Sequence, residues 1–176
     1  EYGILAGVSL SLIILIFRTS RPYVTELGKV PNSDFYRNKY RFKEVEIDNE
    51  VLVFRFDAQL FYANANYFRD ELEEMTIKKG NALKLIVLDA ESINRVDSTG
   101  IDMLKERIRY YKRRNIEFYF AGVKGPVRDA FFKGGLLDEV SLKHFFMRAY
   151  GAVNYFKTGD NQNQIKYAQY IHQAYK

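Results

Sequence analysis

The sequence contains no cysteine and no tryptophan, and only two of its 176 residues are histidine. The absence of cysteine excludes a disulfide scaffold and a thiolate metal site, and it suits a reducing cytosol. With only His144 and His172 available, a histidine-rich metal site is excluded as well. A nucleophile–base pair and a glycine-rich phosphate loop of Walker type are also missing from the sequence. We therefore predict neither an enzyme nor a cofactor.

What the chain does have is a globular composition, with 47% hydrophobic and 28% charged residues. Its length allows one domain of ordinary size, with some residues left over. The net charge of +5 favours an anionic surface, either a membrane or a nucleic acid. Because the isoelectric point of about 9.2 is modest and no nucleic-acid-binding motif is present, we predict no nucleic-acid partner.

An apolar run opens the chain, since the 16 residues from Tyr2 to Phe17 carry no charge. A helix that spans a bilayer needs about 20 apolar residues. We therefore interpret residues 1–18 as the end of a truncated transmembrane helix. Three small residues in this run suit close packing against another membrane helix: Gly3, Ala6 and Gly7.

The charges around the apolar run distinguish a membrane helix from two alternatives. A signal peptide carries its positive charge before the run, whereas here Glu1 precedes the run and Arg18 and Arg21 follow it. A buried core helix would normally show a polar stripe. By the positive-inside rule, the two arginines place the rest of the chain in the cytoplasm, next to the cell membrane.

Three further segments follow the apolar run. Residues 19–40 are predicted to form an extended linker, because no apolar period is visible and proline and glycine interrupt them. The globular domain is predicted to cover residues 41–157. Residues 158–176 are predicted to be a polar C-terminal tail.

Strands and helices are predicted to alternate through the globular domain. Residues 43–47 and 51–56 flank a polar turn, which indicates a β-hairpin. Apolar spacing then predicts a helix over 64–78, a strand over 83–88, a helix after Asp97, a strand over 116–121, and helices over 127–133 and 142–154. This order implies an α/β fold with a mixed sheet of four to five strands and right-handed crossovers.

One short motif carries chemistry: Asp97-Ser98-Thr99-Gly100, between a predicted strand and the next helix. Asp97 is suited to cap that helix. Ser98 and Thr99 fall in its first turn, near free N–H groups and the positive end of the helix dipole. A phosphate on either hydroxyl would be stabilised there but would meet Asp97 and Asp102, a conflict of charge that suits a switch. From spacing alone, a simple helix start is the better explanation of the motif, because such caps are common.

The strand, the Asp97–Gly100 loop and the amphipathic helix after it resemble the signature loop of STAS domains. This fold is shared by bacterial anti-sigma-factor antagonists and the tails of SulP anion transporters. The order of elements over residues 43–154 is similar throughout. The upstream pieces at residues 1–5, 18–22 and 27–31 resemble the end of the SulP membrane domain and its linker.

The resemblance implies a non-catalytic, cytoplasmic regulatory and assembly domain of a secondary transporter for sulfate or a related anion. Its partners would be the membrane domain of the same transporter, a second copy of the full-length protein, and a regulatory protein. The anion would be bound only by membrane helices outside this chain. The loop serine of stand-alone antagonists is phosphorylated, which implies Ser98 as the acceptor and Thr99 as the fallback. The alternative function is a soluble phospho-switch that binds a kinase or an anti-sigma factor.

The helix after Asp97 has a strongly basic outer face, which is either a plain solvated face or a contact surface. The candidate contacts with lipid headgroups or a partner are Lys105, Arg109, Lys112 and Arg113. Residues 61–68 form an aromatic cluster that we predict to be mostly core, with an exposed remainder suited to a partner. His144 is predicted to lie at the surface or at a helix end, without chemistry.

Overall fold

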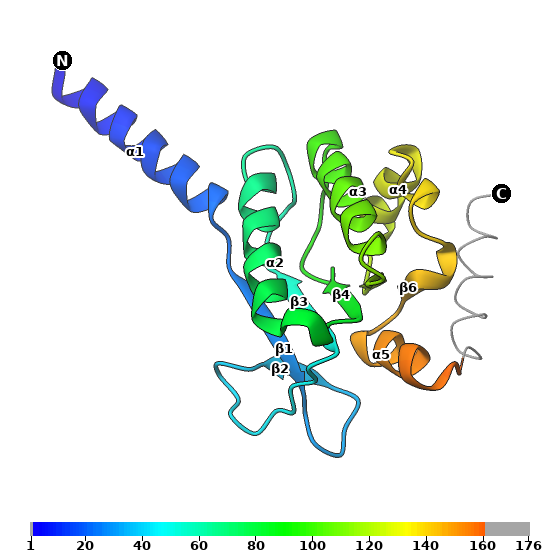
Figure 1. Ribbon diagram of the computed structural model, residues 1–176. Helices are drawn as coiled ribbons and strands as arrows, with labels where there is room; N and C mark the ends of the chain where they lie inside the picture. Colours follow the sequence, from blue (N-terminus) through cyan, green and yellow to red (C-terminus); the bar gives the residue numbers. More distant parts are fainter. Residues whose placement is uncertain (1, 161–176) are drawn as a thin grey trace.

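A computed structural model describes residues 2–160 of the chain (Figure 1). Its centre is a mixed sheet of six strands in the order β2-β1-β3-β4-β5-β6. Strand β1 pairs antiparallel with β2 and β3, while β3 to β6 run parallel to one another. The strands are β1 (Val24–Lys29), β2 (Tyr36–Asn38), β3 (Val51–Phe56), β4 (Leu85–Asp89), β5 (Glu117–Ala121) and β6 (Phe145–Phe146).

Helices cover both faces of this sheet (Figure 1). Those of the domain are α2 (Ala65–Lys79), α3 (Ser98–Lys112), α4 (Gly125–Lys133) and α5 (Ala149–Thr158), joined by 3-10 turns at Gly80–Ala82, Leu136–Asp138 and Leu142–His144. Leu52 and Phe54 of β3 pack with α2, α3 and α4, whereas Val51 and Val53 pack with α5. The unbroken apolar runs of β3 and β4 follow from this burial on both faces. The predicted α/β fold with a mixed sheet is confirmed.

The predicted hairpin is wrong, because the antiparallel partner of β3 is β1 and not the segment that directly precedes β3. Residues 43–47 contribute only one bridge, between Glu46 and Lys29 of β1. Gly28 explains how this segment crosses β1 so closely. A Cβ at Gly28 would lie 2.5 Å from a methyl carbon of Val45, so any larger residue would push the segment away.

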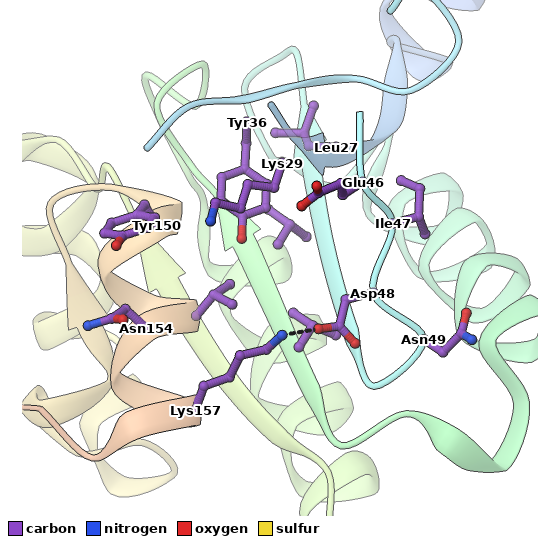
Figure 2. Close-up of a pocket in the computed structure, with 13 residues that line it drawn as sticks. Leu27, Lys29, Tyr36, Glu46, Ile47, Asp48, Asn49, Tyr150, Asn154 and Lys157 are labelled. Carbon is purple, nitrogen blue, oxygen red and sulfur yellow. Dashed lines mark hydrogen bonds and ion pairs between the residues drawn. The ribbon is translucent and has the colours of Figure 1, made fainter. Parts of the chain in front are cut away.

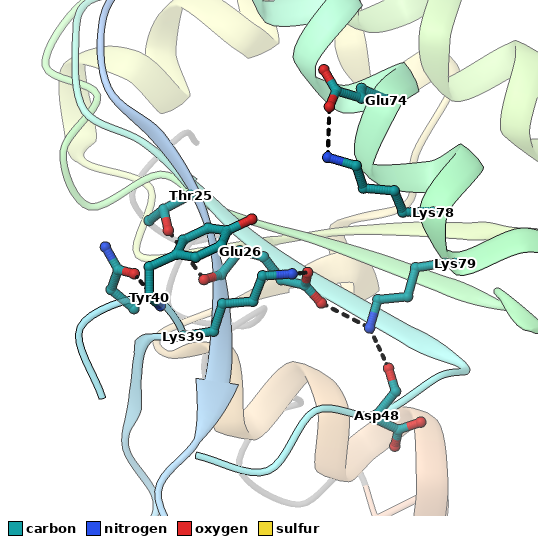
Figure 3. A network of polar contacts seen from close by, with 9 residues as sticks. Thr25, Glu26, Lys39, Tyr40, Asp48, Glu74, Lys78 and Lys79 are labelled. Atoms are coloured by element: carbon teal, nitrogen blue, oxygen red, sulfur yellow. Dashed lines mark hydrogen bonds and ion pairs between the residues drawn. The ribbon is translucent and has the colours of Figure 1, made fainter. Parts of the chain in front are cut away.

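The segment predicted as a linker, residues 19–40, instead contributes strands β1 and β2 to the sheet. A buried polar network holds β1 in place (Figure 3). The carboxylate of Glu26 accepts a hydrogen bond from Lys39 and forms a 2.8 Å ion pair with Lys79 at the end of α2. Lys79 also donates to the backbone carbonyl of Asp48. Such a polar strand shows no apolar period, which is why the sequence did not reveal it.

The electrostatics of Glu26 follow from this network. The side chains of Glu26 and Lys79 are only 8% and 7% exposed. Burial alone would raise the pKa of Glu26, but the two ammonium groups outweigh burial and lower the pKa below its ordinary value. Strand β1 is therefore attached to α2 by a buried ion pair. Removal of either partner would leave an uncompensated charge buried and would destabilise the fold.

The predicted helix over residues 142–154 is also wrong in its first half. That half forms a 3-10 turn and strand β6, and helix α5 begins only at Ala149. The two residues of β6 explain the error: Phe145 packs into the cluster beneath α2, α3 and α4, and Phe146 packs into the cluster beneath α5. Neighbouring residues that point to opposite faces follow the period of a strand, not of a helix.

The apolar start of the chain forms helix α1 (Tyr2–Ser20), which projects from the domain without packing on the sheet (Figure 1). Its apolar side chains are exposed, among them Ile4, Ile13 and Phe17. Within residues 2–160, no helix combines the length and the hydropathy that a membrane crossing requires. Apart from residues 158–160, the predicted polar tail lies outside the described residues.

Candidate functional site

Asp97 is the residue that organises the predicted motif loop. One of its carboxylate oxygens, Oδ1, accepts a 2.8 Å hydrogen bond from the backbone N–H of Gly100 and so caps helix α3. The other oxygen, Oδ2, accepts a 3.0 Å bond from the backbone N–H of Tyr62. The predicted cap is confirmed, and the same side chain also joins the start of α3 to the loop between β3 and α2.

This second loop lies directly against the motif. The backbone N–H of Leu60 donates to the carbonyl of Arg95 at 3.0 Å, and the N–H of Asp97 donates to the carbonyl of Leu60 at 3.1 Å. Gly100 permits the contact, because a Cβ there would lie 2.9 Å from Cγ of Leu60 and 3.0 Å from its carbonyl oxygen. The glycine of the motif therefore has a packing role: it brings two loops together at one end of the sheet.

Asn64 fixes the shape of the second loop and was missed as a site residue. Its side chain is fully buried. Oδ1 accepts from the backbone N–H of Phe61 at 3.0 Å, and Nδ2 donates to the carbonyl of Gln59 at 2.8 Å. The sequence signal was an asparagine just before a helix, which normally indicates a helix cap. Here that side chain makes no cap hydrogen bond to α2 and braces the loop instead.

The two loops together present an exposed surface. Ser98 and Thr99 are exposed in the first turn of α3, as the motif predicts. Tyr62 is 72% exposed beside them, and its ring meets that of Phe61 edge to face. The predicted exposed remainder of the aromatic cluster is thus Tyr62, while Phe68 belongs to the core. Two hydroxyls and one aromatic ring next to the positive end of a helix dipole suit contact with a polar or phosphorylated surface.

The predicted basic face of α3 is largely engaged within the molecule. Lys105 donates to the carbonyl of Gly134 at 3.1 Å, and Arg109 forms a 2.7 Å ion pair with Glu139. Lys112 and Arg113 are exposed at the far end of α3, about 21 Å along the helix from its first residue. The four predicted basic contacts therefore do not gather with Ser98 and Thr99.

Similarity to known proteins identifies the family of this chain. Residues 42–151, more than half of the chain, match the STAS domain family. The chain belongs to the STAS domain family. It is also homologous to the STAS segments of sulfate transporters of the SulP and solute carrier 26 type.

Two curated relatives and one solved structure illustrate what this STAS domain is similar to. It is 33% identical over 156 residues to a probable sulfate transporter of Mycobacterium tuberculosis, covering 89% of this chain and 28% of that protein. It is 27% identical over 162 residues to the chloroplastic sulfate transporter 4.1 of Arabidopsis thaliana, covering 87% and 24%. The structure of the murine solute carrier 26 family member A9 anion transporter, in its inward-facing state, superposes with a TM-score of 0.79 at 23% identity, covering 89% and 25%. The chain thus spans about a quarter of the length of these relatives.

His144 is the last residue of the 3-10 turn Leu142–His144, which confirms the predicted helix-end position. In this STAS domain its ring is half-buried and stacks on Tyr119, with ring centroids 4.6 Å apart. Burial lowers the pKa of His144, Lys112 and Lys143 lower it further, and Glu117 opposes them. Among residues 2–160 no group of three or more His, Asp or Glu side chains is arranged to hold a metal ion.

Proposed function

We propose that this STAS domain is the cytoplasmic regulatory and assembly domain of a SulP-type secondary transporter for sulfate or a related anion. In this proposal the domain is non-catalytic, and the anion path lies in membrane helices outside the chain. Helix α1 is the end of the last of those helices. The homology to sulfate transporters supports the transporter class, and helix α1 carries the claim about the membrane.

The single observation that carries the proposal is the exposure of apolar side chains all around α1. A helix on a soluble domain buries one apolar stripe and leaves a polar face in water. Helix α1 carries no charged residue over residues 2–17, and the apolar side chains that the structure describes there are exposed, among them Leu5, Leu10 and Ile16. Transfer of these side chains into hydrocarbon would remove a large apolar area from water. At the end of the helix, the guanidinium of Arg21 lies 5.1 Å from the ring centroid of Phe17, so a positive charge directly follows the apolar run, as is common at the cytoplasmic end of a membrane helix.

Uptake of labelled sulfate into cells that lack their own sulfate permease tests this proposal. We expect the protein that carries this chain to restore saturable uptake. A variant without residues 24–158 should reach the membrane but lose most of the uptake, because the domain supports assembly and regulation. Absence of sulfate uptake and of uptake of related anions by the unaltered protein would overturn the proposal, as would full uptake by the deletion variant.

Within this function, we propose that the surface of Tyr62, Ser98 and Thr99 is the regulatory contact. Both hydroxyls are exposed, and the rigid Asp97 cap holds them at the start of α3. A phosphate on Ser98, or on Thr99 as the fallback, would be stabilised by the positive end of the helix dipole. It would also be repelled by the nearby carboxylates. The same observation favours the second candidate function, a soluble phospho-switch that binds a kinase or an anti-sigma factor.

Paired substitutions test the regulatory contact. Ser98→Asp and Ser98→Ala should differ in sulfate uptake or in binding to a partner, because only the first introduces a charge at the helix start. Equal behaviour of both variants and the unaltered protein would remove Ser98 from the proposal. If the switch acts without any sulfate uptake, the soluble phospho-switch is the better account.

Lys112 and Arg113 are proposed as contacts to a partner, such as a second copy or a regulatory protein. The N-terminal end of β1, which follows α1, pairs with the C-terminal end of β3. Helix α3 starts at that end of the sheet and ends at the opposite end (Figure 1), so Lys112 and Arg113, at its C-terminal end, lie on the side away from α1. This geometry favours a protein partner over lipid headgroups.

A further inference from the structure

A hollow lies on the face of the sheet that α5 covers, between that helix and strands β1, β2 and β3 (Figure 2). Its volume is about 490 Å³, within the range of small-molecule sites. The floor is apolar and consists of Leu27, Val51, Val53 and Val153. A monocyclic or bicyclic aromatic group would bury one of its faces on such a floor.

Polar side chains converge over this floor. Lys29, Tyr36, Tyr150 and Asn154 line the hollow from β1, β2 and α5 (Figure 2). Within residues 2–160, none of these four side chains has a hydrogen bond or an ion pair to a protein group. Burial, together with nearby Asp48 and Tyr150, raises the pKa of Tyr36 to about 12, so its hydroxyl remains a donor at neutral pH. Hydrogen-bond donors without a protein partner, placed around an apolar floor, are what a ligand-binding site is expected to contain.

Two cations and two carboxylates line the hollow, namely Lys29, Lys157, Glu46 and Asp48. At one end, Asp48 and Lys157 form an ion pair that joins the loop before β3 to α5 and neutralises both charges. Lys29 and Glu46 stand opposite each other in a β-bridge but form no ion pair. The ammonium of Lys29 turns to the ring of Tyr150 instead, 5.5 Å from its centroid. Lys29 is therefore an unpaired cation beside two phenol groups.

Six of the 13 residues that line this hollow lie outside the part of the chain that matches the STAS family. Leu27, Lys29 and Tyr36 precede residues 42–151, and Asn154 follows them. Gly28 lets the segment around Val45 close over β1 at the rim. The site therefore combines residues of the matched domain with residues of the segments that flank it, and it depends on neither the motif loop nor a membrane.

We propose that the hollow binds a small aromatic carboxylate of one or two rings. The carboxylate would accept from the ammonium of Lys29 and from the hydroxyls of Tyr36 and Tyr150, with charge-assisted hydrogen bonds. The ring would lie on the apolar floor, beside the contact between Lys29 and Tyr150. A cationic ligand is disfavoured, because Lys29 already occupies the position over the ring of Tyr150 where a cation would bind.

Equilibrium dialysis with the full chain in lipid nanodiscs tests the site, with 2-naphthoate as the probe. Neutral 2-naphthylmethanol and cationic 2-naphthylmethylammonium are the comparison probes, and Lys112→Met is the matched control for Lys29→Met. We expect saturable binding of 2-naphthoate that Lys29→Met weakens about ten-fold, since a hydrogen bond to a charged group is lost. Binding of the neutral alcohol should be weak and unchanged by Lys29→Met, and Lys112→Met should change neither probe.

Asn154→Asp provides a second variant that does not depend on the folding of Lys29→Met. The change is nearly isosteric and adds a negative charge at the rim, so it should weaken 2-naphthoate binding and strengthen binding of the cationic probe. Equal binding of 2-naphthoate to Lys29→Met and Lys112→Met would overturn the proposal. So would a preference of the unaltered chain for the cationic probe, or the absence of saturable 2-naphthoate binding.

Discussion

At the scale of single residues, Asp97 links two parts of the fold that are 35 positions apart, through its bonds to Gly100 and Tyr62. The cap itself was predictable, because a cap depends only on residues next to one another in the sequence. The bond to Tyr62 and the bracing role of Asn64 were not, because they depend on how the loop before α2 meets the loop before α3.

Replacement of Asp97 by alanine tests the double role of this side chain. Asp97→Ala should reduce the free energy of unfolding by about 1–2 kcal/mol, because α3 loses its cap and the Tyr62 N–H loses its acceptor. Asp97→Asn should retain the cap oxygen and lose less. Chemical denaturation followed by circular dichroism measures both values. Equal stability of Asp97→Ala and the unaltered chain would contradict this role.

His144 predicts a pH dependence of stability. Burial holds its pKa in the folded state below the ordinary value of 6.5, so the unfolded chain binds the proton more readily. The contribution of neutral His144 is therefore complete above about pH 6.5 and is lost as the pH falls below that value. We expect His144→Phe, which preserves stacking on Tyr119, to show a smaller loss of stability between pH 7 and pH 5.5, measured by thermal unfolding. Identical pH profiles of the two proteins would contradict the argument.

At the scale of elements, the regular helices and the parallel strands were predictable, and the antiparallel edge was not. Helices α2, α3 and α4 and strands β3, β4 and β5 each have a local apolar pattern that the sequence displays. Strand β1 is held by Leu27, which packs in the cluster beneath α5, and by the ion pairs of Glu26. Neither interaction can be predicted from the sequence before the partner residues are known. The predicted hairpin and the predicted last helix failed for the same reason, since non-local pairing overrode local pattern.

Glu26 tests how β1 is attached. Glu26→Gln leaves the ammonium of Lys79 buried without its counter-charge, so we expect a loss of about 3 kcal/mol in the free energy of unfolding. The matched control is Glu50→Gln, which breaks the exposed pair with Lys84 and should cost less than about 1 kcal/mol. Urea denaturation of both variants measures the difference. Equal losses in the two variants would contradict the buried attachment.

At the scale of the whole molecule, the two ends of the sheet have different tasks in this account. The end where β1 begins adjoins α1 and also carries Tyr62, Ser98 and Thr99 (Figure 1). The opposite end carries the exposed Lys112 and Arg113. A regulatory event at Ser98 would therefore occur on the side of the domain that leads to α1, which in the proposed function suits transmission to the membrane part of the transporter.

The placement of the domain on the cytoplasmic side of a membrane is the central claim, and cysteine labelling tests it most directly. The chain has no cysteine, so Met147→Cys places a single exposed thiol on the domain. In the protein that carries this chain, with any cysteine outside it replaced, we predict labelling by a membrane-impermeant maleimide in inverted membrane vesicles and not in intact cells. Labelling in intact cells, or recovery of the protein in the soluble fraction, would contradict the account.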